Sequence, residues 1–114
     1  MVPMPRDERA RRLALHVIDI PGSEEILGEL SGECGTSLRT MQRIFSEELG
    51  IPIARWRNQV RMIHAVRILA NGSSDTQIAF DLGFESVSAF VFSFRQNFGV
   101  SPGKYRTRND QGNT

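Results

Sequence analysis

Apolar residues recur every three or four positions over most of the chain, which is the spacing of amphipathic helices rather than of β-strands. The first such segment lies within residues 1–22 and is ended by Pro21-Gly22, a pair that breaks helices. Its apolar stripe consists of Ala10, Leu13, Ala14 and Val17. The pattern predicts an all-α protein that starts with an amphipathic helix.

The chain contains two copies of one pattern. The stretch Leu30-Ser31-x-x-Cys34-Gly35 corresponds to Ile78-Ala79-x-x-Leu82-Gly83, 48 residues further along. Beyond the glycines the offset is 49 residues, because the second turn is one residue longer; the matched positions are Ser37, Met41, Phe45, Leu49 and Gly50 with Ser86, Phe90, Phe94, Phe98 and Gly99. Such self-similarity indicates a repeated supersecondary element.

Each copy has the features of a helix, a tight turn and a second helix. Gly35 and Gly83 supply the positive φ that ends a helix sharply. Two or three residues further on, Ser37 and Ser86 are good N-caps for the next helix. The second helices are predicted at residues 38–49 and 87–98. A short glycine turn between crossing helices is typical of helix-turn-helix units, whose second helix enters a major groove of DNA. We therefore expect two homeodomain-like helix-turn-helix units.

A long helix is predicted between the copies, since Pro52 suits a first helical turn and Asn71-Gly72 a C-terminal stop. Its apolar residues are numerous enough to contact both units: Ile53, Trp56, Val60, Ile63, Ala65, Ile68 and Leu69. A helix of about 20 residues is roughly 30 Å long, close to the ~34 Å of one DNA turn. The expected organisation is a leading helix and approach segment (1–22), first unit (23–50), linker helix (51–72), second unit with a closing turn (73–106) and disordered tail (107–114).

The run from Leu30 to Arg106 resembles the DNA-binding domain of the AraC/XylS family of bacterial transcription regulators. The motifs that carry the resemblance are Gly35-x-Ser37-x-x-x-Met41-Gln42-Arg43-x-Phe45, Leu49-Gly50-x-Pro52, Trp56-Arg57, Arg61-x-x-x-Ala65, Ile78-Ala79-x-x-Leu82-Gly83-Phe84, Phe90-x-x-x-Phe94 and Phe98-Gly99-Val100-Ser101-Pro102-x-x-Tyr105-Arg106. The resemblance implies about seven helices, two helix-turn-helix units on a long linker helix, and activation or repression through contact with RNA polymerase. Many members also carry an effector-binding or dimerisation domain. We expect that domain to be missing from this chain, which is either a small stand-alone regulator or a domain of a longer protein.

We call the second helix of each unit its reading helix. The first reading helix, residues 38–49, presents Arg39, Gln42 and Arg43 on one face, because they lie at positions i, i+3 and i+4. Arginine can bind guanine with two hydrogen bonds, and glutamine can bind adenine in the same way. The resemblance also assigns these positions to base reading. The alternative is a solvated polar face.

The second reading helix departs from the commoner family pattern, in which arginine or glutamine stands near Phe92. Its predicted reading positions are Val87, Ser88, Val91 and Phe92, so no charged side chain is expected to bind a base from that face. Serine can still form a hydrogen bond, and valine or phenylalanine can contact thymine methyl groups. We expect this unit to bind mainly through phosphates and DNA shape. The alternative is an apolar patch for a protein partner.

Contacts with DNA phosphates are predicted for polar and basic residues that flank the reading helices. These are Ser37, Thr40, Arg57, Ser86, Lys104 and Arg106. Arg61 and Arg67 are expected to be structural instead, covering apolar surface with their aliphatic stems.

The charge of the chain is uneven, although it sums to +1 over 114 residues. Residues 37–72 and 95–108 each carry +4, whereas residues 19–36 carry −5 and residues 73–94 carry −3. Such alternation allows one surface to be basic and another acidic, which suits a polyanionic partner. The partner expected here is double-stranded DNA.

Other classes of function find little support in the sequence. The lone Cys34 excludes an internal disulfide and is expected to be a small core hydrophobe, and His16 and His64 lack partners at metal-ligand spacing. No phosphate loop or nucleophile elbow appears, so neither an enzyme, a cofactor nor a metal is expected. No apolar run is long enough for a membrane, and no signal peptide is recognisable, so a cytoplasmic protein is expected. The rival to a DNA-binding regulator is a helical protein-interaction module that kept the fold and lost DNA reading.

Overall fold

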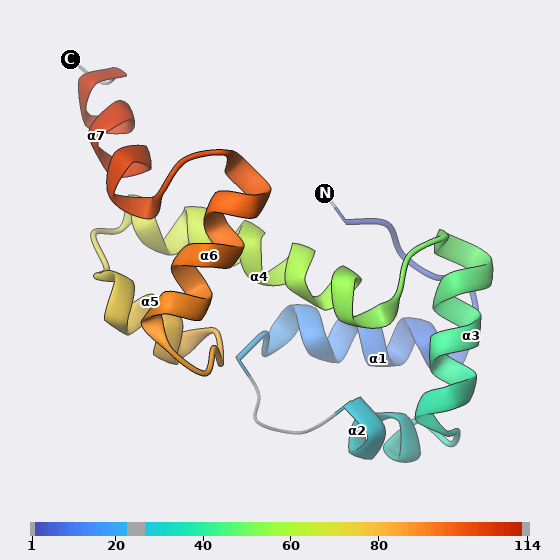
Figure 1. The fold of residues 1–114 in the computed structure, drawn as a ribbon. Coiled ribbons are helices and arrows are strands. Elements are labelled where there is room, and N and C mark those ends of the chain that lie inside the picture. The colour runs from blue at the N-terminus through green and yellow to red at the C-terminus, as the bar shows by residue number, and fades with distance from the viewer. Residues whose placement is uncertain (1, 23–26, 113–114) are drawn as a thin grey trace. The chain divides into compact units, whose positions relative to one another are not determined.

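The computed structural model of the protein describes residues 2–22 and 27–112. Over this part of the chain the secondary structure is entirely α-helical, as predicted (Figure 1). The helices are α1 (Glu8–Asp19), α2 (Leu27–Glu33), α3 (Leu38–Leu49), α4 (Ile53–Ala70), α5 (Asp75–Asp81), α6 (Val87–Phe98) and α7 (Pro102–Gly112). The two predicted reading helices, 38–49 and 87–98, coincide with α3 and α6.

The chain divides into two compact units, and the boundary falls within α4, between Arg61 and Met62. Each unit has its own hydrophobic core. The first core is built from α1, α2, α3 and the beginning of α4, and its largest residue is Trp56, with no exposed surface. The indole ring lies edge-on to Phe45, with ring centroids 5.4 Å apart, a favourable arrangement for two aromatic rings.

The segment before α1 is part of the first unit. The indole N–H of Trp56 donates to the carbonyl oxygen of Pro3 at 2.7 Å, so the buried ring has its polar group satisfied. The carboxylate of Glu48 accepts hydrogen bonds from the backbone N–H groups of Arg6 and Asp7. Asp7 then caps α1 by accepting from the N–H groups of Arg9 and Ala10. The approach to α1 is therefore held against α3 and α4.

The second core is built around phenylalanines of α6. Phe90 and Phe94 are fully buried, and their rings form a chain of contacts that continues to Phe98 and Tyr105. The four-residue spacing of Phe90, Phe94 and Phe98 predicts that Phe98 also faces inward, yet 39% of its surface is exposed. It lies in the last turn of α6, where it contacts the rings of Phe94 and Tyr105.

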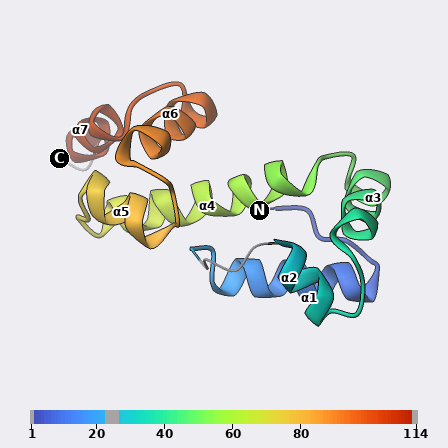
Figure 2. The ribbon, with the colours of Figure 1, turned by 60° about the horizontal axis from the view of Figure 1, so that its bottom comes forward.

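The turns of the two units repeat each other in their hydrogen bonds. Gly35 has φ 84° and Gly83 has φ 72°, a conformation that a side chain would strain. In each unit the residue after the glycine donates back to a carbonyl five residues earlier, from Thr36 to Ser31 and from Phe84 to Ala79. This is the hydrogen bond of a Schellman motif. Ser31 on α2 and Ala79 on α5 are themselves buried, as expected of small residues on helices that pack against α3 and α6. Figure 2 shows both helix pairs from a second side.

The linker helix α4 contributes to both cores, as its apolar residues predicted. Ile53, Trp56 and Val60 belong to the first core, and Met62, Ala65 and Leu69 to the second. The expectation for Ile63 was wrong: its side chain is 41% exposed, and the neighbouring Met62 is buried in its place. Both residues are apolar, so periodicity alone did not distinguish them.

The C-terminus differs from the expectation of a closing turn followed by a disordered tail at 107–114. Helix α7 begins at Pro102 and continues to Gly112, and residues 113–114 lie outside the described part. Ser101 supports the first turn, since its hydroxyl accepts from the N–H of Lys104 at 3.1 Å. No proline interrupts the residues after Pro102, so the polar composition of this segment does not prevent a helix. The expected start of the first unit at residue 23 also lies outside the described part, which resumes at Leu27, the first residue of α2.

Candidate nucleic-acid interface

Helix α3 buries one face and exposes another. Met41, Ile44 and Phe45 are buried in the first core. Arg39, Gln42 and Arg43 are all exposed, so the structure brings the three predicted base-reading residues to the surface of one helix. This separation follows from the 3.6-residue period, which places every third and fourth residue on one face.

The guanidinium of Arg43 lies 3.1 Å from the carboxylate of Glu47, one turn further along α3. The two side chains keep 58% and 63% of their surfaces exposed. An ion pair this exposed contributes little stability, because water screens it. Arg43 can therefore exchange Glu47 for another acceptor at small cost.

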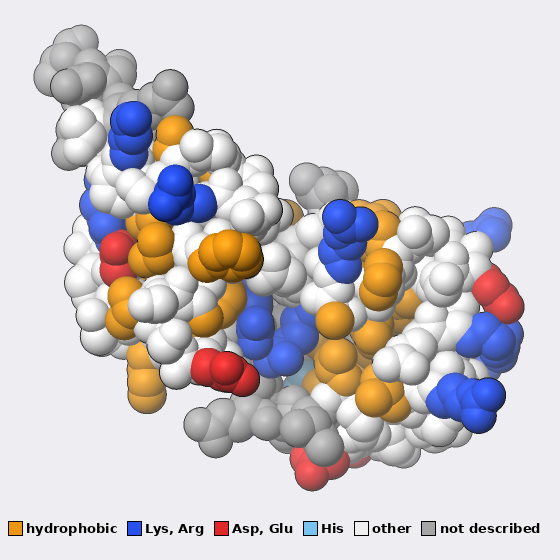
Figure 3. Space-filling model, viewed as in Figure 1, with side chains coloured by type: hydrophobic (Ala, Val, Ile, Leu, Met, Phe, Trp, Pro, Cys, Tyr) orange, Lys and Arg blue, Asp and Glu red, His pale blue; other side chains and the backbone are white. Residues whose placement is uncertain are grey.

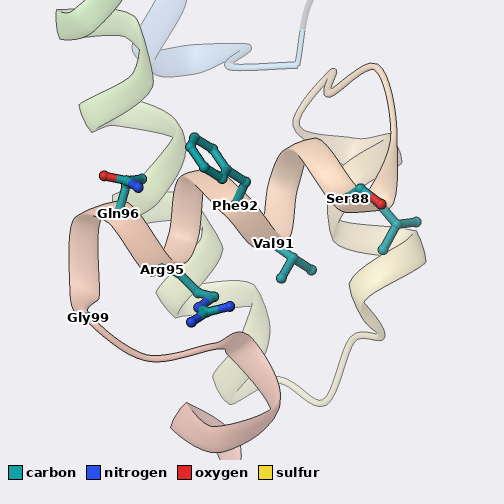
Figure 4. A pocket seen from close by; sticks show the side chains of 7 residues that line it. Ser88, Val91, Phe92, Arg95, Gln96 and Gly99 are labelled. Carbon is teal, nitrogen blue, oxygen red and sulfur yellow. The ribbon is translucent and has the colours of Figure 1, made fainter.

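The outer face of α6 carries the four predicted reading positions together with two residues that the sequence analysis missed. Val87, Ser88, Val91 and Phe92 line a shallow hollow of about 620 Å³, and Arg95, Gln96 and Gly99 extend it along the helix (Figure 4). Arg95 adds a charged side chain to this face, since it follows Val91 by four residues and shares its side of α6. That no charged side chain binds a base from this face stays a prediction. The same four-residue spacing, applied from Val91 and Phe92, would have identified Arg95 and Gln96.

Hydrophobic side chains are prominent on the surface of the second unit (Figure 3). Phe92 on α6 is 66% exposed, and Phe80 on α5 is 80% exposed. The phenylalanines of this unit therefore do not all belong to the core, because Phe80 and Phe92 fall outside the i, i+4 series that includes Phe90 and Phe94.

The predicted phosphate-binding serines are the N-caps of the two reading helices. Ser37 accepts from the N–H of Thr40 at 3.2 Å, and Ser86 accepts from the N–H of Ala89 at 3.0 Å. Ser37 also donates to the hydroxyl of Thr40, so both polar side chains predicted at the start of α3 belong to one cap. The remaining N–H groups of a first helical turn have no partner within the helix and are suited to phosphate oxygens.

Two arginines of α4 are half-buried in the first unit. Burial lowers the pKa of Arg57 from its ordinary value. Burial, with the charge of Arg57 as a smaller cause, lowers the pKa of Arg61 to about 10. Both groups still carry a positive charge at neutral pH. The structure thus places the predicted phosphate residue Arg57 next to a second cation one turn away.

Arg106 and Lys104 stand in different surroundings on α7. Lys104 is exposed, whereas the guanidinium of Arg106 lies 2.6 Å from the carboxylate of Asp75 and donates to the carbonyl oxygen of Ser73 at 2.7 Å. These contacts tie α7 to the start of α5. They favour a structural role for Arg106 over the phosphate contact predicted from the sequence.

We expect Arg106→Ala to lower the free energy of unfolding by about 1–2 kcal/mol, because it removes a partly buried ion pair with Asp75 and a charged hydrogen bond to Ser73. Chemical denaturation followed by circular dichroism would measure the loss. Lys104→Ala is the matched control on the same helix and should change stability by less than about 0.5 kcal/mol. Equal effects of the two substitutions would contradict a structural role for Arg106.

Over the described residues, no three His, Cys, Asp or Glu side chains are grouped so as to hold a metal ion. In the same part of the chain no helix has the length and apolar character to cross a membrane. Cys34 is buried, and burial raises the pKa of its thiol, which agrees with the expected role as a core residue.

Two helix-turn-helix units that share one long helix define the class of this protein. The sequence profile of the helix-turn-helix domain family matches residues 30–108, more than two-thirds of the chain. The protein belongs to the AraC/XylS-type helix-turn-helix family, as its motifs indicated.

The similarities to individual proteins agree with this assignment. The chain is 33% identical over 82 residues to the HTH-type transcriptional regulator NimR of Escherichia coli, covering 72% of this chain and 30% of NimR. It is 30% identical over 105 residues to the HTH-type transcriptional regulator RipA of Corynebacterium glutamicum, covering 92% of this chain and 32% of RipA. The DNA-binding domain of AdpA, solved in complex with a target DNA, has the same fold, with a TM-score of 0.81 and 24% identity over 90% of this chain and 93% of that domain. The chain thus spans about three-tenths of the length of these two regulators.

Proposed function

We propose that this chain is a sequence-specific double-stranded DNA-binding domain of a bacterial transcription regulator. The observation that carries the proposal is the exposed group of Arg39, Gln42 and Arg43 on α3, the second helix of a capped helix-turn-helix unit. Such a helix reads base edges in a major groove, and arginine and glutamine side chains can form bidentate contacts with guanine and adenine. Family membership and the DNA complex of a protein with the same fold support the same conclusion.

We further propose that α6 reads a second, successive major groove. Its position in the second unit repeats that of α3 in the first, including the serine cap and the left-handed glycine at its end. The N–H groups at the two helix starts, together with Arg57 and Lys104, would hold phosphates and thereby set the register on the duplex.

A regulator that contains this domain would act in the bacterial cytoplasm, together with other domains and with RNA polymerase. The similar regulators are about three times longer than the stretch they share with this chain. A separate effector-binding or dimerisation domain, and contact with RNA polymerase to activate or repress transcription, accord with membership of the family.

Arg43→Ala should weaken binding to the specific site by about 1–3 kcal/mol and relax discrimination at the base pair that Arg43 reads, because a bidentate contact is lost. The site would be obtained by selection from random duplexes. Binding of the variant to the selected duplex and to a random duplex would then be measured by gel shift.

Arg11→Ala is the matched control, because it removes the same charge from an exposed position of α1 in the same unit. It should leave the ratio of specific to random binding unchanged. An Arg43→Ala loss that is equal on every sequence would contradict base reading by this residue.

The second candidate function is a protein-interaction module. The apolar outer face of α6, with Phe92 66% exposed, is the observation in its favour. A chain of this kind would show no preference for any selected duplex over random DNA at matched salt concentration.

A further inference from the structure

The outer face of α6 is unusual for a surface meant to read hydrogen-bonding groups. Of its two rows of side chains, one contains Val91 and Arg95 and the other Phe92 and Gln96 (Figure 4). The first half of this face is therefore mainly apolar, and its charged and amide groups lie in the last turns. Ser88 is the single hydroxyl among the four positions nearest the start.

Phe92 is 66% exposed and Val87 is 37% exposed, and with Val91 they line one hollow on the outer face of α6. A contiguous apolar patch, unlike a single exposed residue such as Phe80, points to a ligand that covers it. The second helix of a helix-turn-helix unit enters the groove with its N-terminal residues nearest the base edges. In this unit those residues are Val87, Ser88 and Val91, followed by Phe92. The part of α6 that approaches the bases is thus the apolar part.

The major groove offers one apolar group for such a surface. Thymine presents its C5-methyl there, whereas the remaining groups that distinguish base pairs in this groove are hydrogen-bond donors and acceptors. Arg95 and Gln96, nearer the C-terminal end of the helix, are placed for phosphate or sugar groups at the border of the same surface.

We propose that α6 recognises its half of the DNA site through thymine C5-methyl groups, which Val91 and Phe92 contact. The inference rests on the proposed DNA-binding function and specifies its chemistry. The two reading helices then divide the recognition: α3 reads hydrogen-bonding edges with Arg39, Gln42 and Arg43, and α6 reads methyl groups.

The test replaces each thymidine of the selected duplex, one at a time and on both strands, by deoxyuridine. This change removes the C5-methyl and leaves base pairing intact. We expect about a fourfold loss of affinity at one or more positions, the factor that burial of one methyl-sized group contributes to an equilibrium constant. Fluorescence anisotropy titrations of labelled duplexes would measure it.

The variants Val91→Ala and Phe92→Ala assign the effect to α6. In at least one of them, the thymidine-to-deoxyuridine ratio at a sensitive position should fall to about one. Phe80→Ala is the matched control, because Phe80 is an even more exposed phenylalanine of the same unit and lies off the α6 face. It should leave that ratio unchanged, and circular dichroism would establish that all three variants fold.

The outcomes separate this inference from the proposed function. Specific binding with no deoxyuridine effect at any position would overturn methyl reading and leave DNA recognition by α3 in place. A deoxyuridine effect that persists in both α6 variants would also overturn it, since the methyl groups would then be read elsewhere. Failure to select any sequence would overturn the proposed function itself and favour a protein partner for the apolar face.

Discussion

Replacing Trp56 by alanine should lower the free energy of unfolding by about 3–5 kcal/mol, the usual cost of removing a large buried aromatic side chain. The indole ring is fully buried, contacts Phe45 at 5.4 Å and donates to Pro3. Its loss would leave a cavity in the first core and remove the hydrogen bond to Pro3. Since small domains are stable by only about 5–15 kcal/mol, the first unit would be close to unfolding.

Chemical denaturation followed by circular dichroism would measure this effect, because Trp56 is the one tryptophan of the chain and its fluorescence disappears with the substitution. Trp56→Phe is the milder comparison, since it keeps one aromatic ring and removes the hydrogen bond to Pro3 together with the second ring of the indole. We expect it to cost about 1–2 kcal/mol. A Trp56→Ala loss below about 1 kcal/mol would contradict the central place of this residue in the first core.

DNA affinity should fall steeply with salt. Contact with about 4–6 phosphates gives a slope of log affinity against log salt of roughly −3.6 to −5.4, so raising salt from about 50 to 200 mM should weaken binding about 10²–10³-fold. The reason is that each neutralised phosphate releases condensed counterions. Anisotropy titrations of the selected duplex at four salt concentrations would determine the slope.

Two substitutions on α7 sharpen this prediction. Lys104→Ala should make the slope shallower by about one, as expected for one phosphate contact. Arg106→Ala should leave it nearly unchanged, because its guanidinium is already paired with Asp75. A DNA affinity that does not change with salt concentration would contradict binding through the phosphate backbone.

The helical class, the repeat and the bounds of both reading helices were predictable because their signals are local. A serine that caps a helix and a glycine with positive φ act within a few residues, so each marks its helix end wherever the chain is placed. The buried stripe of α3 follows from helical periodicity in the same way. For this reason the exposure of Arg39, Gln42 and Arg43 on α3 could be foreseen.

Contacts between distant residues could not be foreseen from such signals. Trp56 and Pro3 are separated by 53 positions, and Arg106 and Ser73 by 33. No periodicity in the sequence indicates either contact. Only the tertiary structure shows that Arg106 pairs with Asp75, which competes with the predicted phosphate contact. Packing likewise buried Met62 instead of Ile63, because two adjacent apolar residues satisfy the same pattern and only the shape of the core selects between them.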